Sequence, residues 1–364
     1  MGVMAKLPKS KHQLQLNLAL QGGGAHGAFT WGVLDRLLEE EDIDIVGISG
    51  TSAGAMNAAV LIEGYEENGR QGAKDQLAKF WAEISGVSRF LGPTLQSPFG
   101  HLADAFQVDY SPVYSAFDMI TRMFSPYEMN PLNINPLRGV LETIIDFDRL
   151  RTHKLNKHLF VTATNVETGQ ARVFSCDEIS VDVLLASACL PFMFQAVEIE
   201  GVPYWDGGYM GNPSIWPLFY KTECDDIMLV QINPIERPGT PKKSIDIVNR
   251  LNEISFNSSL LAELRAVNFV KELLEQGKLN SEDYRDVNIH MVNPPSDLHE
   301  MTAETKLNAS WQFFTFLHQV GRDRTEDWLH QHKSKIGKKS SLDIEKTFLN
   351  RPADITHHLK RSHV

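Results

Sequence analysis

The segment Gly50–Gly54 (GTSAG) constrains the fold of this chain more than any other feature. It joins an apolar run at 43–49, long enough only for a strand, to a small apolar run at 53–63 that suits a buried helix. A serine flanked by glycines at such a junction is typical of a nucleophile on a strained strand-to-helix turn. The helix N-terminus would also face developing negative charge. We therefore predict that Ser52 is a nucleophile supported by Gly50 and Gly54, against the alternative of a plain Gly/Ser turn.

A second glycine-rich turn, Gly22-Gly23-Gly24, follows an alternating apolar segment at 14–20 and opens a helical pattern at 25–40. Bare glycine amides let a substrate oxygen approach closely, as an oxyanion hole requires. The repeated order of strand, turn and helix predicts a parallel sheet with right-handed crossovers. Both turns would then face each other at the carboxyl edge of that sheet.

The triglycine also fits a dinucleotide-binding interpretation, because Gly22, Gly24 and Gly27 match the pattern G-x-G-x-x-G. That fold places an acidic residue at the carboxyl end of the next strand. Here the acidic residues at 39–44 precede or open that strand. An NAD(P)-binding fold would also leave the serine turn unexplained, so it is the weaker hypothesis.

The remaining pattern continues the alternation of strands and helices. We predict hairpins at 159–175 and 196–205, strands at 227–232 and 287–292, and helices at 73–84, 179–188, 245–274 and 307–328.

A serine nucleophile needs a base, and histidine is the first candidate to consider. His290 and His299 follow Ser52 in the order of the α/β-hydrolases. That fold requires several strands before its nucleophile, whereas only two precede Ser52. A structural role for these histidines is therefore the better interpretation.

Asp206 is the better candidate base. It follows a predicted strand and precedes Gly207 and Gly208, which leave its carboxylate unobstructed. Partial burial beside Trp205 and Tyr209 would raise its pKa and improve it as a base. An ordinary Asp-Gly turn is the alternative.

Four blocks, in this order, resemble the patatin-like phospholipases: Gly22–Gly24, Gly50–Gly54, Ala186–Pro191 (ASACLP) and Asp206–Gly208. The resemblance covers roughly residues 14–213. It implies an α/β protein with a three-layer α/β/α fold, a mainly parallel sheet and a Ser–Asp dyad without histidine. By the same resemblance Ser52 is the nucleophile, Asp206 the base and Gly22–Gly24 the oxyanion hole. The implied activity is hydrolysis of lipid carboxylic esters through an acyl-enzyme, with no metal or cofactor.

Five further residues are expected to line the site: His26, Ser187, Pro191, Gly207 and Gly208. At position 26 the family commonly has Arg or Lys. The histidine weakens the case for a fixed positive charge near the oxyanion. It leads us to expect activity that is sensitive to pH near about 6.5, the ordinary pKa of histidine.

Three alternatives to hydrolysis stay open. A lipid transacylase would use the same dyad, a lipid-binding scaffold would use no chemistry, and an NAD(P)-binding protein would bind a dinucleotide. Residues 89–136 contain six prolines and many aromatic residues. We predict an insertion there that walls an acyl-chain pocket, with plain core packing as the alternative.

Charge and composition set the remaining expectations. The net charge of −11 disfavours nucleic acid as a partner, and a lipid or membrane-interface substrate is expected instead. Residues 333–364 carry eight Lys and Arg against three Asp and Glu, so we expect a basic tail that is solvated or touches anionic lipid. The chain divides into an extension at 1–13, a hydrolase domain at 14–332 and this tail.

Location is predicted from what the sequence lacks. There is no apolar run of about 20 residues that would form a transmembrane segment and no signal-peptide pattern. The three cysteines show no metal spacing. We expect a cytoplasmic protein with a peripheral membrane association, and we make no prediction of its oligomeric state.

Overall fold

The computed structural model describes residues 13–90, 124–152, 155, 157–237, 239–280, 282–295, 298 and 304–349. Most of the predicted insertion at 89–136 lies outside the described residues, as do the extension at 1–12 and the end of the predicted tail at 350–364.

In the described part of the chain the strands form one eight-stranded sheet in the order β5-β6-β3-β2-β1-β7-β8, with β4 paired to β3. Strands β3, β2, β1, β7 and β8 are mutually parallel, whereas β4, β6 and β5 add antiparallel pairs at one side. Their bounds are β1 Leu14–Leu20, β2 Ile43–Gly50, β3 His158–Asn165, β4 Ala171–Ser175, β5 Val197–Ile199, β6 Val202–Asp206, β7 Asp226–Val230 and β8 Asn288–Val292.

The predicted long helices are present, with shifted ends. The helices are α1 Gly27–Leu37, α2 Ala53–Phe90, α4 Pro126–Met129, α5 Pro136–Ile144, α6 Phe147–Thr152, α7 Val181–Ser187, α8 Trp216–Lys221, α9 Ser244–Glu275 and α10 Trp311–His332. The helix α2 joins two predicted helices across a bend at Asn68 and Gly69. Short single-turn segments include η1 Gly24–His26, η3 Gly207–Tyr209, η5 Glu304–Leu307, η6 Lys333–Lys335 and the π-helical η7 Glu345–Leu349.

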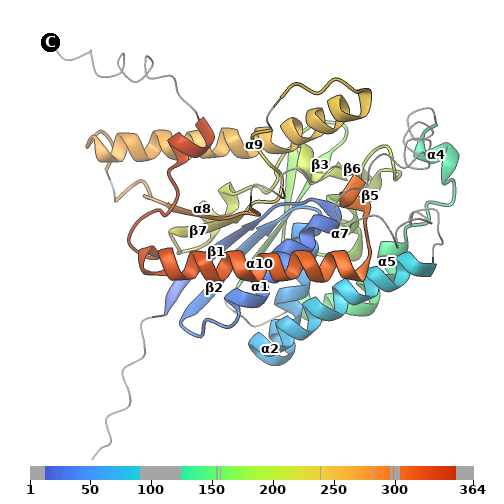
Figure 1. Cartoon of the computed structure of the whole chain (residues 1–364), viewed down its shortest axis with the longest axis horizontal. Coiled ribbons are helices and arrows are strands. Elements are labelled where there is room, and N and C mark those ends of the chain that lie inside the picture. The colour runs from blue at the N-terminus through green and yellow to red at the C-terminus, as the bar shows by residue number, and fades with distance from the viewer. Residues whose placement is uncertain are drawn as a thin grey trace, which may run out of the picture.

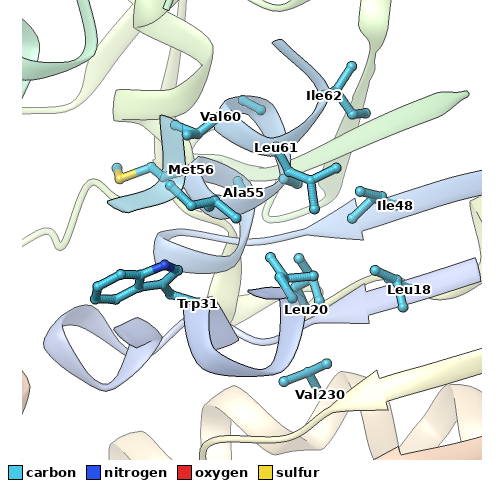
Figure 2. Packing of buried hydrophobic residues seen from close by; sticks show 14 of the residues in the cluster. Leu18, Leu20, Trp31, Ile48, Ala55, Met56, Val60, Leu61, Ile62 and Val230 are labelled. Carbon is cyan, nitrogen blue, oxygen red and sulfur yellow. The ribbon is translucent and has the colours of Figure 1, made fainter. Parts of the chain in front are cut away.

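Two apolar clusters, one on each face of the sheet, hold three layers together (Figure 1). Along β1 the side chains alternate: Leu18 and Leu20 join the cluster that contains α1, α2, α7 and α10, whereas Ala19 joins the cluster of α8 and α9. Figure 2 shows Leu18 beside Ile48 of the neighbouring strand, and Leu20 under Leu61 of α2. The predicted three-layer α/β/α fold with a mainly parallel sheet is confirmed.

The first residues of the predicted basic tail pack on the body of the protein. Lys333 forms ion pairs with Glu40 and Asp42, and Ile336 and Phe348 are buried. The charge pattern predicted a solvated tail. The described part of this segment packs on the body instead, because it also carries apolar side chains. Within the described residues no helix has the length and apolarity needed to cross a bilayer.

Helices α1 and α10 pack closely because each carries a glycine at the crossing (Figure 1). A Cβ added to Gly32 would lie 1.9 Å from the carbonyl oxygen of His318, and one added to Gly321 would lie 2.2 Å from that of Phe29. The two backbones therefore touch without intervening side chains.

We predict that Gly321→Ala lowers the free energy of unfolding by about 1–3 kcal/mol, because a methyl group must push the two helices apart. Gly139→Ala in α5 is the matched control, since a Cβ there meets no atom within 4 Å. That control is expected to gain up to about 1 kcal/mol from helix propensity. Urea denaturation measures both changes, and an unchanged Gly321→Ala protein would contradict the close crossing.

Candidate active site

The turn at Gly50–Gly54, which we name the serine turn, holds Ser52 in a conformation that non-glycine residues rarely adopt. Its φ angle is +53°. A Cβ added to Gly54 would lie 2.3 Å from the carbonyl oxygen of Leu20, and one added to Gly50 would lie 2.7 Å from the amide nitrogen of Ala55. The turn is therefore compact enough to require both glycines, and α2 begins directly after the serine.

Asp206, the last residue of β6, lies beside Ser52, whose hydroxyl is near enough to the Asp206 carboxylate to favour its ionised form. The β3–β6 pairing places Asp206 opposite Ala163, and the Thr164 hydroxyl donates to the Asp206 carbonyl at 2.8 Å. The sheet thus fixes the backbone of Asp206 from one side. The residues that the sequence separates by 154 positions meet at one edge of the sheet.

Burial raises the pKa of Asp206 to about 7, since its side chain is only 2% exposed. Three groups oppose that rise and favour the carboxylate: the Gly208 N–H, which donates at 2.7 Å, the Ser52 hydroxyl and the positive charge of Lys306. A carboxyl group with this pKa exchanges protons readily near neutral pH, as a general base must.

The ASACLP segment holds both members of this pair. The Ser187 hydroxyl accepts a hydrogen bond from the Ser52 N–H at 2.8 Å and donates to the Thr162 carbonyl at 2.7 Å. Two residues later, the Cys189 carbonyl accepts from the Asp206 N–H at 2.8 Å. Ser187 is fully buried, so it supports the site from behind and does not line it. Pro191 is partly exposed, and its lining role stays a prediction.

The triglycine lies directly against the serine turn. A Cβ added to Gly22 would lie 2.7 Å from the Cβ of Ser52. The Gly22 N–H donates to Asn212 Oδ1 at 2.7 Å, and its carbonyl accepts from Asn233 Nδ2 at 2.7 Å. The N–H and the carbonyl of Gly22 thus both form hydrogen bonds within the protein.

The next two amides remain available for a ligand. The N–H groups of Gly23 and Gly24 donate to no acceptor in the described part of the chain. Gly24 has a φ of +57°, and a Cβ there would lie 2.5 Å from the carbonyl oxygen of Lys306. Of the three predicted oxyanion donors, these two are therefore the candidates, and Gly22 holds the turn in place.

Gly207 and Gly208, which follow Asp206, have different contacts. A Cβ on Gly207 would lie 2.0 Å from the Thr162 carbonyl oxygen, so this residue packs against β3. Gly208 contacts the carboxylate of Asp206 through its N–H.

The expectation that His26 titrates near its ordinary pKa of 6.5 is wrong, whereas its lining role stays a prediction. Its side chain is buried, and its Nε2 lies 2.7 Å from the Thr305 hydroxyl. Burial, with a smaller contribution from the charge of Lys306, lowers its pKa to about 3. The imidazole is therefore neutral near pH 6.5 and does not impose a titration on activity there.

His290 does not belong to this site. Its ring is fully buried between the Asp226 carboxylate, at 2.9 Å, and the Ser341 hydroxyl, at 3.0 Å. Asp226 opens β7, so this cluster lies toward the amino edge of the sheet, opposite the serine turn. His299 lies outside the described residues.

Three polar residues near the triglycine were not predicted: Asn212, Asn233 and Lys306. Asn233 follows the carboxyl end of β7 and therefore lies at the same edge as the two turns, a pattern that could have revealed it. Lys306 has no comparable local pattern. Among the described residues, no group of His, Cys, Asp and Glu has an arrangement that fits a metal ion.

Comparisons with known proteins place this geometry in context. The family model described as patatin-like phospholipase matches residues 18–219. The chain is similar to VipD from Legionella pneumophila, at 16% identity and a TM-score of 0.43, over 96% of this chain and 75% of that one. It is also similar to ExoU in its complex with SpcU from Pseudomonas aeruginosa, at 16% identity and a TM-score of 0.38, over 96% of this chain and 59% of that one. No curated protein sequence matches the chain.

We predict that Asp206→Asn is more stable than the wild type at about pH 8 and nearly equal to it at about pH 3. The unfolded carboxyl group titrates near 3.8 and the folded one near 7. Between these values the folded state binds the extra proton, so wild-type stability falls as the pH rises. An amide removes that loss and keeps an acceptor for the Gly208 N–H. Thermal melts across this range measure the difference, and a less stable variant at the higher pH would contradict the buried-carboxylate description.

Proposed function

The chain belongs to the patatin-like phospholipase family, and from that premise we propose that its lipid ester hydrolysis proceeds through a dyad of Ser52 and Asp206. Family membership identifies it as a lipid ester hydrolase. The observation that carries the dyad is the proximity of the Ser52 hydroxyl, on its strained turn, to the buried Asp206 carboxylate.

In the first half of the reaction, Asp206 takes the hydroxyl proton as Ser52 Oγ attacks the ester carbonyl carbon. The carbonyl oxygen gains a negative charge, which the N–H groups of Gly23 and Gly24 receive. The amino end of α2 adds a favourable dipole. Collapse of the tetrahedral intermediate breaks the ester C–O bond, and Asp206 returns its proton to the departing alcohol.

In the second half, Asp206 removes a proton from water, whose oxygen attacks the carbonyl carbon of the acyl-enzyme. The bond between Ser52 Oγ and the acyl group then breaks, Asp206 returns the proton to Ser52 Oγ, and a fatty acid is released. One carboxylate performs both proton transfers, which is feasible because its pKa of about 7 leaves both protonation states populated near neutrality. Ser187 holds the serine turn through its hydrogen bond to the Ser52 N–H. Asn212 and Asn233 hold Gly22 in the same way. These bonds fix the position of the Ser52 hydroxyl relative to the Gly23 and Gly24 amides.

The end of the insertion gives the site an apolar neighbour. The Tyr127 hydroxyl accepts from the Ala196 N–H at 3.3 Å, and Gln195 Nε2 donates to the Asn130 carbonyl at 2.7 Å. These contacts follow directly after the ASACLP segment. Exposed apolar side chains gather in this part of the sequence: Phe124, Tyr127, Met129, Leu132, Ile134 and Phe192. We assign them to the contact with the acyl chain of the substrate.

Polar substitution there is expected to change chain-length preference. We predict that Leu132→Ser combined with Ile134→Ser lowers kcat/KM for long acyl chains by about tenfold relative to short ones, since each lost apolar contact weakens long-chain binding. Tyr220→Ser, at a similarly exposed position on α8, is the control. A series of esters of increasing chain length gives the ratio, and an unaltered ratio would remove these residues from the acyl contact.

We predict that a fluorophosphonate probe labels the wild-type protein at Ser52, and that peptide mapping finds the tag there. Ser52→Ala abolishes labelling and lowers ester hydrolysis by about a thousandfold or more, because the nucleophile is absent. Asp206→Asn folds and labels far more slowly.

His290→Gln serves as the control, because its ring lies at the other edge of the sheet, and it labels at the wild-type rate if it folds. Full hydrolysis by Ser52→Ala would disprove the dyad. Product analysis with added acceptor alcohols separates hydrolysis from acyl transfer.

A further inference from the structure

Lys306 reaches the active site from a part of the chain beyond the matched family region at 18–219. It lies in η5, between β8 and α10. This segment packs on η1, with the Lys306 carbonyl oxygen 2.5 Å from the position that a Cβ on Gly24 would occupy. The backbone of Lys306 therefore lies against the glycine turn that receives the oxyanion in the proposed mechanism.

The side chain of Lys306 connects to the same turn through Asn233. Lys306 Nζ donates to Asn233 Oδ1 at 2.8 Å, and Asn233 Nδ2 donates to the Gly22 carbonyl at 2.7 Å. The Asn233 N–H in turn donates to Gln21 Oε1 at 2.8 Å. A hydrogen bond from a charged donor is stronger than a neutral one and polarises the bonds that follow it. The chain of contacts from Lys306 thus ends at the residue that touches Ser52.

The charge of Lys306 also acts on the two titratable groups nearest the triglycine. It lowers the pKa of Asp206 against the larger effect of burial, and it contributes to the low pKa of His26. Burial lowers the pKa of Lys306 itself, while Glu253 and Asp206 oppose that change and Arg237 adds to it.

The neighbouring charges are paired among themselves. Glu253 forms ion pairs with Arg237 at 2.6 Å and with Arg250 at 3.1 Å. Cys189 and Tyr209 also sense the charge of Asp206. Burial raises the pKa of each, to about 12, so neither brings a charge to the site near neutral pH. His26 is neutral as well, which leaves Lys306 to balance the carboxylate.

We propose that Lys306 is a positioning residue for the dyad, whose ammonium group supplies the positive charge that His26 does not. This inference rests on the Ser52–Asp206 mechanism proposed above. Through Asn233 the same side chain holds the triglycine turn against the serine turn. Its distinguishing property is electrostatic, so its loss moves the pH dependence of the reaction and not only its rate.

The test compares Lys306→Met, Lys306→Gln and Lys306→Arg by the pH dependence of kcat/KM on a p-nitrophenyl ester. Met and Gln are expected to shift the acidic limb upward by about one pH unit, which lowers kcat/KM near pH 7 by up to about tenfold. Arg is expected to keep the limb in place. Lys306→Gln is the most informative variant, because it keeps a hydrogen-bond donor for Asn233 and removes only the charge. It also replaces Lys306→Met in the test if that variant does not fold.

Lys157→Met is the matched control. This lysine is also buried and pairs with Asp44 at 2.9 Å, but it precedes β3 at the amino edge of the sheet. It is expected to lower stability and to leave the acidic limb unmoved.

The pH dependence of fluorophosphonate labelling at Ser52 provides a readout that is independent of substrate. An unshifted limb in folded Lys306→Gln, with labelling intact, would overturn the role of Lys306 and leave the dyad standing. If the wild-type protein itself is not labelled at Ser52, the proposed function fails, and this inference fails with it.

Discussion

The proposed active site depends on the contact between two backbone turns that leave no space for side chains. A Cβ on Gly22 would lie 2.7 Å from the Cβ of Ser52, and a Cβ on Gly54 would lie 2.3 Å from the carbonyl oxygen of Leu20. Because β1 and β2 are parallel neighbours in register from Asn17 onward, both turns leave the sheet at the same edge and at a fixed spacing. The sheet therefore sets the distance between Ser52, the proposed nucleophile, and the Gly23 and Gly24 amides proposed to receive the oxyanion.

A buried carboxylate beside that contact makes stability and activity compete. Burial raises the pKa of Asp206 to about 7, which suits a base but opposes folding wherever the group is ionised. The protein limits this cost by fixing the backbone of Asp206 through β3 and through the Cys189 carbonyl. The same short segment fixes the Ser52 N–H through Ser187. One connection after α7 thus positions both members of the pair.

Sequence patterns predicted what local geometry determines and missed what long-range packing determines. The strand–turn–helix order and the apolar periodicity were sufficient for the parallel sheet and for the two glycine turns at its edge. The three layers and the role of the ASACLP segment were expected from the family resemblance. The state of His26 was not predictable, since its low pKa follows from burial and from Lys306, 280 positions away in the chain. The hydrogen bonds that hold the backbone of Gly22 likewise depend on Asn212 and Asn233. The sequence around these two asparagines does not indicate which residue they contact.

The identities of residues 26 and 306 are physically linked. A cation at position 26, as is common in this family, would share one buried environment with the ammonium group of Lys306, which already disfavours a charge on His26. Two buried like charges at such range repel strongly, because little solvent screens them. A neutral ring at position 26, whose Nε2 contacts Thr305, is compatible with a charged lysine at the next position in the chain, 306. Lys306 can therefore supply the positive charge only because the side chain at position 26 is neutral.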